Sequence, residues 1–589
     1  MLQPLIELTL ADHTMASTVT LADYLFGRLR QLGVGSIHGV PGDYNLELLD
    51  YVEPAGLRWV GNANELNAAY AADAYARIKG IGAVITTFGV GELSAVNGIA
   101  GAYAEFAPVV HIVGIPPRSS IDGRLLIHHT FNDGEYRRFA AMHAHVTVAQ
   151  ACLTDPRTSA EQIDDVLRQC LLYSRPVYIE VPVDMVAKPL SASRLESPVE
   201  VPQGEQDAEQ NGVLETVLQK IYDAKKPVIF VDGESRPLGI CKQAEQIVEG
   251  TKWPTWTTPF GKSLTNETLT NFHGIYQGKY DDPAVQRFIG DADLILIFGP
   301  HFSSTNTSAW SSIPNENVSV LFTTKGVQVG GKLFRDVSAK TVVSQLASAL
   351  DFSRVASYSP YPELPRDKSL RIADMPMDEP LEQSALWKVL AGMVNPGDIV
   401  LGETGTAGYG VREMPLPPDT RLFTPVTWLS IGYMLPGAQG AALAQRELLA
   451  SSPSSGPSTP KTILFIGDGS FQMTVQEIAT IVRLELNVVI FLINNDGYTI
   501  ERCIHGRNQA YNDVSPLRYL EAPSFFGAKK STYTASARTW RELQTVLDSG
   551  TLHDEKELRM VEIFLGRDDA PKGPLLQYMI SQKEKESAT

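Results

Sequence analysis

The segment KTILFIGDGSFQMTVQEIATIVRLELNVVIFLINNDGYTIE, residues 461–501, decides the fold predicted for this chain. Two β-branched apolar runs, KTILFIG and NVVIFLI, lie on either side of the stretch TVQEIATIVRLE. In that stretch Val475, Ile478 and Val482 recur at intervals of three and four residues, which is typical of a helix with one buried face. Apolar strands around such a helix predict a βαβ unit in a buried parallel sheet.

A polar cluster follows each of these two strands. GDGS (467–470) follows the first, and NNDGYTIE (494–501) follows the second. Neighbouring parallel strands end at one edge of the sheet, where open α/β sheets hold their ligands. A tight turn with a capping Asp or Ser would explain GDGS alone, but not the second cluster. Asp468, Asn495 and Gly497 offer a carboxylate, an amide oxygen and a backbone carbonyl, which predicts a Mg²⁺ site with positions left for phosphate oxygens.

GDGS followed about two dozen residues later by NN resembles the metal and diphosphate motif of the thiamine diphosphate enzymes. INNDGYTIE is similar to the form found in the pyruvate decarboxylase family, and the resemblance runs from about Leu21 to about Asp569. It implies thiamine diphosphate and Mg²⁺ as cofactors. It also implies a carboxy-lyase that decarboxylates a 2-keto acid without oxidation, through a thiamine diphosphate ylid and an enamine.

Length and composition limit the other possibilities. With 589 residues the chain is too long for one core and predicts about three domains. Its net charge of −17 argues against nucleic acid or an anionic membrane as partner. The four cysteines lack paired spacing, which favours free thiols in a reducing, cytoplasmic compartment. No apolar run reaches the roughly 18 residues of a membrane helix, and the first residues lack a secretory signal pattern.

Alternating strand and helix patterns predict three consecutive doubly wound α/β domains separated by polar, Pro-rich segments. The predicted division is an N-terminal extension (1–18), a pyrimidine-binding domain (19–187), a linker (188–210), a middle domain (211–352), a second linker (353–382), a diphosphate- and Mg-binding domain (383–569) and a C-terminal tail (570–589). The domain names follow from the resemblance. The run SSPSSGPSTP (451–460) predicts a surface loop.

Glu65 lies in GNANELNAAYAADAYAR, where a strand gives way to an Ala-rich helix. A glutamate in the first turn of a helix is commonly structural, because it complements the helix dipole. NANELNAAYAAD, however, resembles the glutamate motif of the family. The resemblance implies that Glu65 hydrogen-bonds the cofactor's aminopyrimidine and so promotes deprotonation of the thiazolium carbon.

Four further residues match the family's proton-handling set. Asp43 lies in VPGDYN, His128 and His129 lie in LLIHHTFNDG, and Glu501 ends NNDGYTIE. Taken singly, Asp43 could be a turn residue and the adjacent histidines incidental. The resemblance implies that Glu501 and the Asp43–His129 pair transfer the protons of decarboxylation and aldehyde release, whereas His128 orients the substrate.

Further cofactor contacts follow from the resemblance. GETGTAG (402–408) is similar to a loop that contacts diphosphate and pyrimidine, with Thr404 and Thr406 as candidates. Ile431 matches an apolar residue that separates the two cofactor rings, although it could be ordinary core. Leu429 replaces the glycine of the usual WGSIG. Its backbone carbonyl can still accept a hydrogen bond from the cofactor's 4′-amino group, unless the position requires a positive φ. The predicted cofactor residues also include Glu65, Asp468, Gly469, Ser470, Asn495 and Thr499.

The reaction that the resemblance implies is conversion of pyruvate to acetaldehyde and CO₂, as in alcoholic fermentation. Trp428, Ile500 and Ile504 match positions that wall the substrate pocket and would leave space for little more than a methyl group, although both isoleucines could be core. The same reaction on phenylpyruvate, indolepyruvate or branched-chain acids is the main alternative. A catalytically silent scaffold is a second alternative, and carboligation is disfavoured by the double histidine.

The resemblance also predicts a homodimer or a dimer of dimers, that is a homotetramer. Glu65 and the diphosphate motif lie in different domains, which in the family meet across a subunit interface. The segment VIFVDGESRPLG of this chain matches a segment in which family members from yeast carry a cysteine proposed for substrate activation. This chain has Gly233 and Glu234 there instead.

Overall fold

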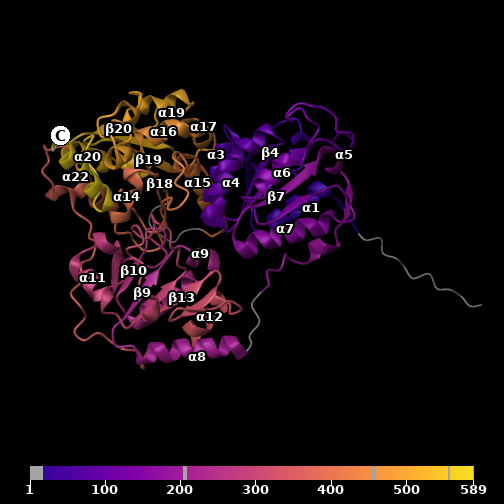
Figure 1. The fold of residues 1–589 in the computed structure, drawn as a ribbon. Helices are drawn as coiled ribbons and strands as arrows, with labels where there is room; N and C mark the ends of the chain where they lie inside the picture. The colour runs from indigo at the N-terminus through magenta and orange to yellow at the C-terminus, as the bar shows by residue number, and fades with distance from the viewer. Residues whose placement is uncertain (1–16, 203–207, 453–458, 555–556, 588–589) are drawn as a thin grey trace, which may run out of the picture.

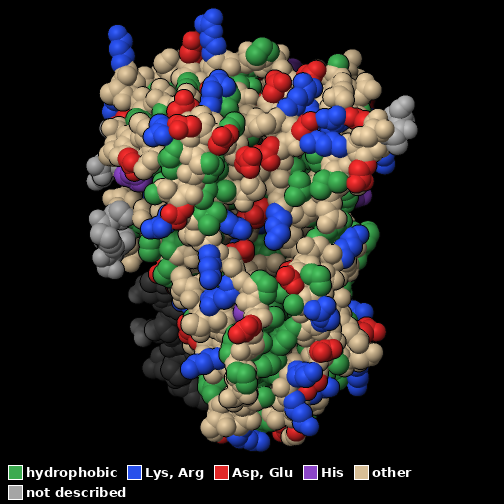
Figure 2. All heavy atoms as spheres, turned by 90° about the vertical axis from the view of Figure 1, so that its left-hand side faces the viewer, with side chains coloured by type: hydrophobic (Ala, Val, Ile, Leu, Met, Phe, Trp, Pro, Cys, Tyr) green, Lys and Arg blue, Asp and Glu red, His purple; other side chains and the backbone are tan. Residues whose placement is uncertain are grey.

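The computed structural model describes residues 17–202, 208–452, 459–554 and 557–587 (Figure 1). Most of the predicted N-terminal extension, part of the first linker and most of the 451–460 run lie outside the described residues. Three α/β sheets follow one another along the chain, each within one predicted domain range. On the side shown in Figure 2 acidic and basic side chains are interspersed, so the net negative charge is not gathered there.

The first sheet is parallel throughout, with strand order β3-β2-β4-β5-β7-β6. Its strands are β2 (Ser36–Gly39), β3 (Arg58–Trp59), β4 (Gly82–Thr87), β5 (Val109–Ile115), β6 (Gln150–Cys152) and β7 (Val177–Pro182). Its helices are α1 (Leu21–Gln31), α2 (Leu46–Leu49), α3 (Glu65–Lys79), α4 (Val90–Ala104), α5 (Arg118–Asp122), α6 (Arg138–His143) and α7 (Ser159–Tyr173).

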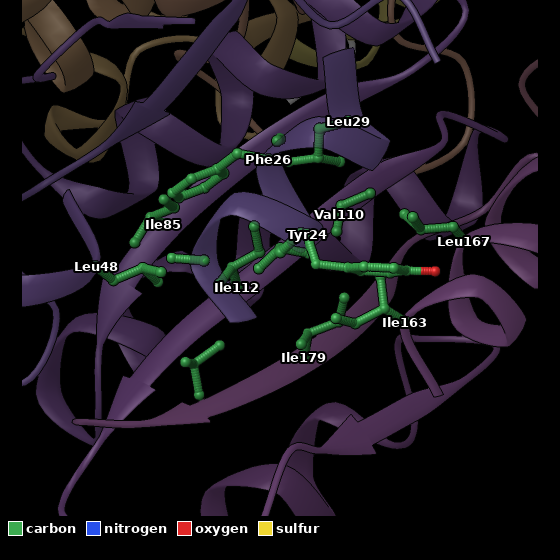
Figure 3. Close-up of a cluster of buried hydrophobic side chains, with 14 of the residues drawn as sticks. Tyr24, Phe26, Leu29, Leu48, Ile85, Val110, Ile112, Ile163, Leu167 and Ile179 are labelled. Atoms are coloured by element: carbon green, nitrogen blue, oxygen red, sulfur yellow. The ribbon is translucent and has the colours of Figure 1, made fainter. Parts of the chain in front are cut away.

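Both faces of this sheet are covered by helices. Ile85 of β4 packs in the core beneath α1 and α7, which Figure 3 shows around Tyr24 and Ile163. Its neighbour Val84 points to the other face, where the alanines of α3 and Ile99 of α4 pack. Alternation of side chains along one strand therefore fills two separate cores, as a doubly wound domain requires.

The third sheet repeats the topology of the first. It is parallel throughout, with order β17-β16-β18-β19-β21-β20, so both sheets place their strands, counted along the chain, as 2-1-3-4-6-5. The strands are β16 (Ile399–Gly402), β17 (Arg421–Phe423), β18 (Thr462–Gly467), β19 (Val488–Asn494), β20 (Thr534–Ala537) and β21 (Arg559–Phe564). The helices are α13 (Gln383–Leu390), α14 (Thr406–Gly410), α15 (Met434–Ser451), α16 (Asp468–Thr474), α17 (Ile478–Arg483), α18 (Thr499–Ile504), α19 (Ala522–Phe525), α20 (Trp540–Leu547), α21 (Gly550–Asp554) and α22 (Pro574–Ser587).

The middle sheet is mixed. Its order is β11-β10-β9-β12-β13-β14-β15, and the pairs β13–β14 and β14–β15 are antiparallel whereas the others are parallel. The strands are β9 (Pro227–Val231), β10 (Thr255–Thr257), β11 (Phe272–Ile275), β12 (Leu294–Phe298), β13 (Ser319–Thr323), β14 (Gly326–Val329) and β15 (Lys332–Phe334). The helices are α8 (Ala208–Asp223), α9 (Ser235–Leu238), α10 (Cys241–Thr251), α11 (Pro283–Gly290) and α12 (Ala339–Ala349).

Helix α3 joins the first and third domains. Its small residues allow close packing on both sides: Ala69 meets Gly98 of α4, and the backbone of Ala71 approaches Gly440 of α15 so closely that a Cβ there would lie 2.0 Å from the Ala71 oxygen. Tyr70 and Tyr75 pack in the same core as α15. The Ala-rich composition thus reflects a helix that is buried nearly all round.

Segments outside the predicted domains are structured as well. Residues 189–191 of the first linker form β8 (Pro189–Ser191), which pairs antiparallel with β1 (Thr18–Thr20). The predicted C-terminal tail includes α22, whose Leu575 and Met579 pack against Cys503. All four cysteines are free. Within the described ranges, no helix combines the length and apolar character needed to cross a membrane.

Candidate active site

The predicted metal and diphosphate residues converge where the strand order of the third sheet reverses. β16 and β18 are neighbours there, and their next strands along the chain lie on opposite sides. Such a switch point leaves a crevice at the strand ends. A cavity of about 20 Å³ lies at this point and is lined only by residues of the third domain: Thr404, Gly405, Thr406, Ile431, Gly467, Asp468, Gly469, Ser470, Asn495, Gly497, Tyr498, Thr499 and Ile500.

Asp468 is buried at the start of α16, so GDGS opens the helix that was predicted to begin at 474. The helix is interrupted by a 3₁₀ turn at Val475–Glu477. One carboxylate oxygen of Asp468 accepts the Gly469 N–H at 2.8 Å, and the other accepts the Gly497 N–H at 2.9 Å. Burial raises its pKa to about 6. Among the described residues no basic side chain lies within 4.0 Å of it, so none of them forms an ion pair with this carboxylate.

The side-chain amide of Asn495 can be turned in two ways. In one, its oxygen lies 2.9 Å from the Gly497 carbonyl and 3.3 Å from the Asp468 carboxylate, so three oxygens face one another without a hydrogen between them. In the other, the amide nitrogen donates to both, and the oxygen accepts from Thr499 and Thr406. A cation among the three oxygens would select the first orientation. This arrangement of a carboxylate, an amide and a carbonyl oxygen can hold Mg²⁺.

The loop after β16 supplies hydroxyl groups beside these oxygens. The Thr404 hydroxyl is buried and has no hydrogen-bond partner among the residues that the structure describes, and the Thr406 hydroxyl lies 3.2 Å from the Asn495 amide nitrogen. Ser470 donates to the Thr404 carbonyl at 3.3 Å. At Gly469 a Cβ would lie 2.4 Å from the Tyr498 ring, so no side chain fits there. An unpaired buried hydroxyl is the kind of group that a phosphate oxygen satisfies.

Sequence reasoning missed Glu403, although it stands in GETGTAG. Its carboxylate accepts the Thr404 and Met434 N–H groups, each at 2.7 Å, and so ties the loop to the start of α15. Full burial raises its pKa to about 7. The signal was available, because a glutamate directly after a buried strand has few ways to reach water.

The loop 425–432 presents Leu429 and Ile431. Leu429 has φ +55°, so the position that was predicted to be sensitive to a positive φ does adopt one. The loop is fixed from the first domain by Glu105, whose Oε1 accepts the N–H groups of Val426 at 2.9 Å, Thr427 at 2.8 Å and Trp428 at 3.2 Å. Its other oxygen pairs with Arg77 at 3.1 Å. Glu105 was also missed, because the three loop N–H groups that it accepts lie more than 300 residues away.

A second group of candidates lies at the equivalent switch point of the first sheet. Asp43 follows β2, and its carboxylate forms a short hydrogen bond with His128 Nε2. His129 Nε2 lies 3.8 Å from the other Asp43 oxygen, so His128 rather than the expected His129 is the closer partner in a single chain. Tyr44 stacks on His128 with ring centroids 5.1 Å apart. The side chains of Asp43, His128 and His129 are 49%, 58% and 30% exposed.

Glu65 begins α3 and belongs to this second group. A Cβ at Gly91 of α4 would lie 3.1 Å from its Oε1, and one at Gly89, two residues earlier, would lie 2.2 Å from the His129 carbonyl. The half-buried Glu65 therefore lies near the start of α4 with His129. Burial raises its pKa. None of Glu65, Asp43, His128 and His129 lines the cavity at Asp468.

The predicted substrate-pocket residues lie apart in one chain. Ile500 lines the cavity and packs against the α22 core. Ile504 is 54% exposed on α18, and Glu501 is exposed on the same helix. Trp428 is 44% exposed and donates its indole N–H to Asn97 of α4 at 2.9 Å. Within the described part of one chain, these positions do not assemble a closed pocket.

Family models match all three domains. They are described as the thiamine pyrophosphate enzyme N-terminal TPP binding domain (residues 19–136), central domain (214–350) and C-terminal TPP binding domain (403–562). The chain is also similar to curated proteins named pyruvate decarboxylase. That from Aspergillus parasiticus is 55% identical over 94% of this chain and 96% of its own length. That from Aspergillus fumigatus is 40% identical over 95% and 97%. Isozyme 1 from Saccharomyces cerevisiae is 38% identical over 97% and 99%.

A solved structure shares the fold. It is a thiamine diphosphate-dependent 4-hydroxybenzoylformate decarboxylase from Rhodococcus jostii, with a TM-score of 0.74 and 19% identity, covering 94% of this chain and 100% of its own. At that identity the likeness supports the three-domain fold alone.

Proposed function

The chain belongs to the thiamine pyrophosphate enzyme family, and from that premise we infer that it is a thiamine diphosphate-dependent carboxy-lyase that converts pyruvate to acetaldehyde and CO₂. Relatives named pyruvate decarboxylase that match nearly its whole length support the choice of substrate. One structural observation carries the inference: a buried carboxylate, which forms no ion pair among the described residues, faces two further oxygens at the switch point of the third sheet.

These residues fit the cofactor. We propose that Asp468, Asn495 and Gly497 bind Mg²⁺, since their oxygens, 2.9 and 3.3 Å apart, match the roughly 2.9 Å edges of an octahedron with Mg–O distances of about 2.0–2.1 Å. The Thr404 and Thr406 hydroxyls would donate to the diphosphate. When bound, thiamine diphosphate supplies the carbon nucleophile and electron sink that a 2-keto acid needs to lose CO₂.

The remaining candidates handle protons. Burial raises the pKa of Glu65, which favours a carboxyl group that holds a proton and can share it with a ring nitrogen. We propose that Glu501 and the Asp43–His129 pair deliver protons to the reacting carbon. His128 is held by both Asp43 and Tyr44, which supports a role in orienting substrate.

We further propose that the active unit is a homodimer, assembled in turn into a dimer of dimers. The cavity of about 20 Å³ at Asp468 has room for about one water molecule and holds no residue of the first domain. The Asp43–His128–His129 group is correspondingly exposed. A second copy would bring its Glu65 group over the first copy's Asp468. The free cysteines support a reducing compartment, and we place the reaction in cytoplasmic alcoholic fermentation.

The test is a steady-state assay of the pure protein with thiamine diphosphate and Mg²⁺ against a panel of 2-keto acids. Pyruvate should have the highest kcat/KM, followed by 2-ketobutyrate, with phenylpyruvate poor. A higher kcat/KM for phenylpyruvate, indolepyruvate or a branched-chain acid would replace the proposed substrate. No turnover of any acid by a folded, cofactor-loaded protein would support the scaffold alternative.

A further inference from the structure

A separate cavity of about 250 Å³ lies between the middle domain and the third domain. Its lining comes from Ile275 and Tyr280 of the middle domain, from Arg412 just after α14, and from Lys572 and Tyr578 near the C-terminus. The two domains meet on the left of Figure 1, the side that faces the viewer in Figure 2. The volume exceeds the roughly 150 Å³ at which an apolar protein cavity already binds benzene, so a small organic molecule fits.

Arg412 lines this cavity without a counter-ion. Its guanidinium carbon lies 4.4 Å from the centre of the Tyr409 ring. Among the described residues no carboxylate oxygen lies within 4.0 Å of it, and its Nε is enclosed without a hydrogen-bond acceptor. The adjacent Glu413 forms no ion pair with it among the described residues, and its carboxylate accepts the backbone N–H of Lys572 at 3.0 Å.

An enclosed guanidinium without an anion is unfavourable. Arginine keeps its proton in proteins, so the group cannot escape the cost of desolvation by becoming neutral. Burial lowers the pKa of Arg412 and raises that of Glu413. Lys572, exposed at the rim, forms no ion pair among the described residues. Of the charged side chains that line the cavity, Arg412 and Lys572 are positive and Glu413 is negative, so the lining has one positive charge in excess, which a single carboxylate would balance.

We propose that this cavity is a binding site for a small organic monocarboxylate. The carboxylate pairs with the Arg412 guanidinium, and Lys572 adds a second positive charge at the rim. Pro259 and Ile275, both buried, offer an apolar surface to a short carbon chain, and Tyr280 offers a hydroxyl. The planar guanidinium, which can bind both carboxylate oxygens, favours this ligand class over a single-point anion.

The site adjoins the candidate active site. Arg412 lies in the 3₁₀ turn Val411–Glu413 that continues from α14, and α14 carries Thr406 of the cofactor cavity. Tyr409 of α14, beneath the guanidinium, packs in the same apolar cluster as Ile500, which also lines that cavity. A carboxylate on Arg412 would thus tighten the segment 406–413. This consequence for the active site rests on the proposed function, whereas binding of the carboxylate does not.

Isothermal titration calorimetry of the cofactor-loaded protein with L-lactate tests the proposal, because lactate has the size of a three-carbon keto acid but is not one. Arg412→Gln should weaken one class of lactate sites at least tenfold, and Lys572→Gln about threefold. Lys279→Gln, which removes an exposed charge beside Tyr280 but outside the lining, should leave binding unchanged. Lactamide, the neutral analogue, should not bind this class of sites.

Hydrogen exchange provides an independent measurement. Lactate should slow exchange of the amides of 406–413 several-fold in the wild type and not in Arg412→Gln. If Arg412→Gln does not fold, Arg412→Lys, which keeps the charge and loses the planar fork, should weaken lactate less than tenfold but measurably. Lactate binding that is the same in wild type, Arg412→Gln and Lys572→Gln would overturn the proposal, as would equal binding of lactamide. Displacement of lactate by an equal concentration of inorganic phosphate would overturn the choice of a carboxylate.

Discussion

Replacing Asp468 with Asn tests whether its buried charge exists to bind a metal. The change keeps the size of the side chain and removes its charge. Two backbone N–H groups donate to separate carboxylate oxygens of Asp468, and an amide can accept only one of them. The variant therefore removes the cost of a buried charge but leaves one backbone N–H without an acceptor. The free energy of both effects can be estimated.

A pKa raised from 3.8 to about 6 corresponds to roughly 3 kcal/mol. Because the folded chain binds this proton more tightly than the unfolded chain, the free energy of unfolding falls as pH rises from about 4 to about 6, and the full cost is present at pH 7. Asp468→Asn removes this cost but leaves one N–H unpaired, at about 1–3 kcal/mol. Without cofactor at pH 7, the variant should be as stable as wild type or up to about 2 kcal/mol more stable.

The cofactor should reverse this ranking. At one hundred times its Kd, a ligand that binds only the folded chain adds about 2.7 kcal/mol. Wild type should gain that amount from Mg²⁺ with thiamine diphosphate, whereas Asp468→Asn should gain little. Thermal unfolding between pH 5 and 8, with and without both ligands, measures both effects. Asp496→Asn is the control, because that neighbouring carboxylate is 74% exposed. A full ligand-induced rise of Tm in Asp468→Asn would refute the assignment of the metal site.

Four further outcomes are expected. Inactive Glu65→Gln and inactive Asp468→Ala proteins, mixed under conditions that exchange subunits, should recover part of the activity, and no recovery despite proven exchange would place both groups of an active site in one chain. Leu429→Gly should raise stability by about 1 kcal/mol by removing a positive φ from a non-glycine residue, as measured by thermal unfolding; a loss of stability would show that the side chain matters more than the backbone. Ile504→Ala should raise the kcat/KM ratio of branched or aromatic acids to pyruvate, and an unchanged ratio would remove Ile504 from the substrate pocket. Burial raises the pKa of Cys241 to about 11, so its thiol should react slowly with iodoacetamide at pH 7, and its modification, followed by mass spectrometry, should not alter the shape of the rate curve.

The features that the sequence predicts best are those set by neighbouring residues. Apolar runs and the helix between them place Asp468 and Asn495 at the ends of adjacent strands, because parallel strands must end together. The helix after GDGS was placed six residues too late, since the apolar period begins only at Val475 and carries no information about the first turn. The convergence of Asp468, Asn495 and Gly497 could therefore be predicted from the local sequence pattern and the geometry of a parallel sheet alone.

Features that depend on distant partners were not predictable. Glu105 and Arg412 are ordinary charged residues in the sequence, and their importance comes from what surrounds them after folding. Glu105 meets three amide groups more than 300 residues away, and Arg412 meets no acid at all among the described residues. Even the family resemblance could only raise the question of φ at Leu429. The φ of Leu429 is set by hydrogen bonds between the first domain and the loop 425–432, so only the folded structure shows it.

The bond between Glu105 and loop 425–432 also bears on how the chain is made. Synthesis proceeds from the N-terminus, and domains generally fold in that order. Glu105 and α4 can therefore be in place before the loop leaves the ribosome, and the emerging N–H groups of Val426, Thr427 and Trp428 meet a fixed acceptor. The first domain then serves as a template for part of the third. A third domain produced as a separate fragment would lack this template, so its own sheet could form while the loop that carries Leu429 and Ile431 stayed without its native shape.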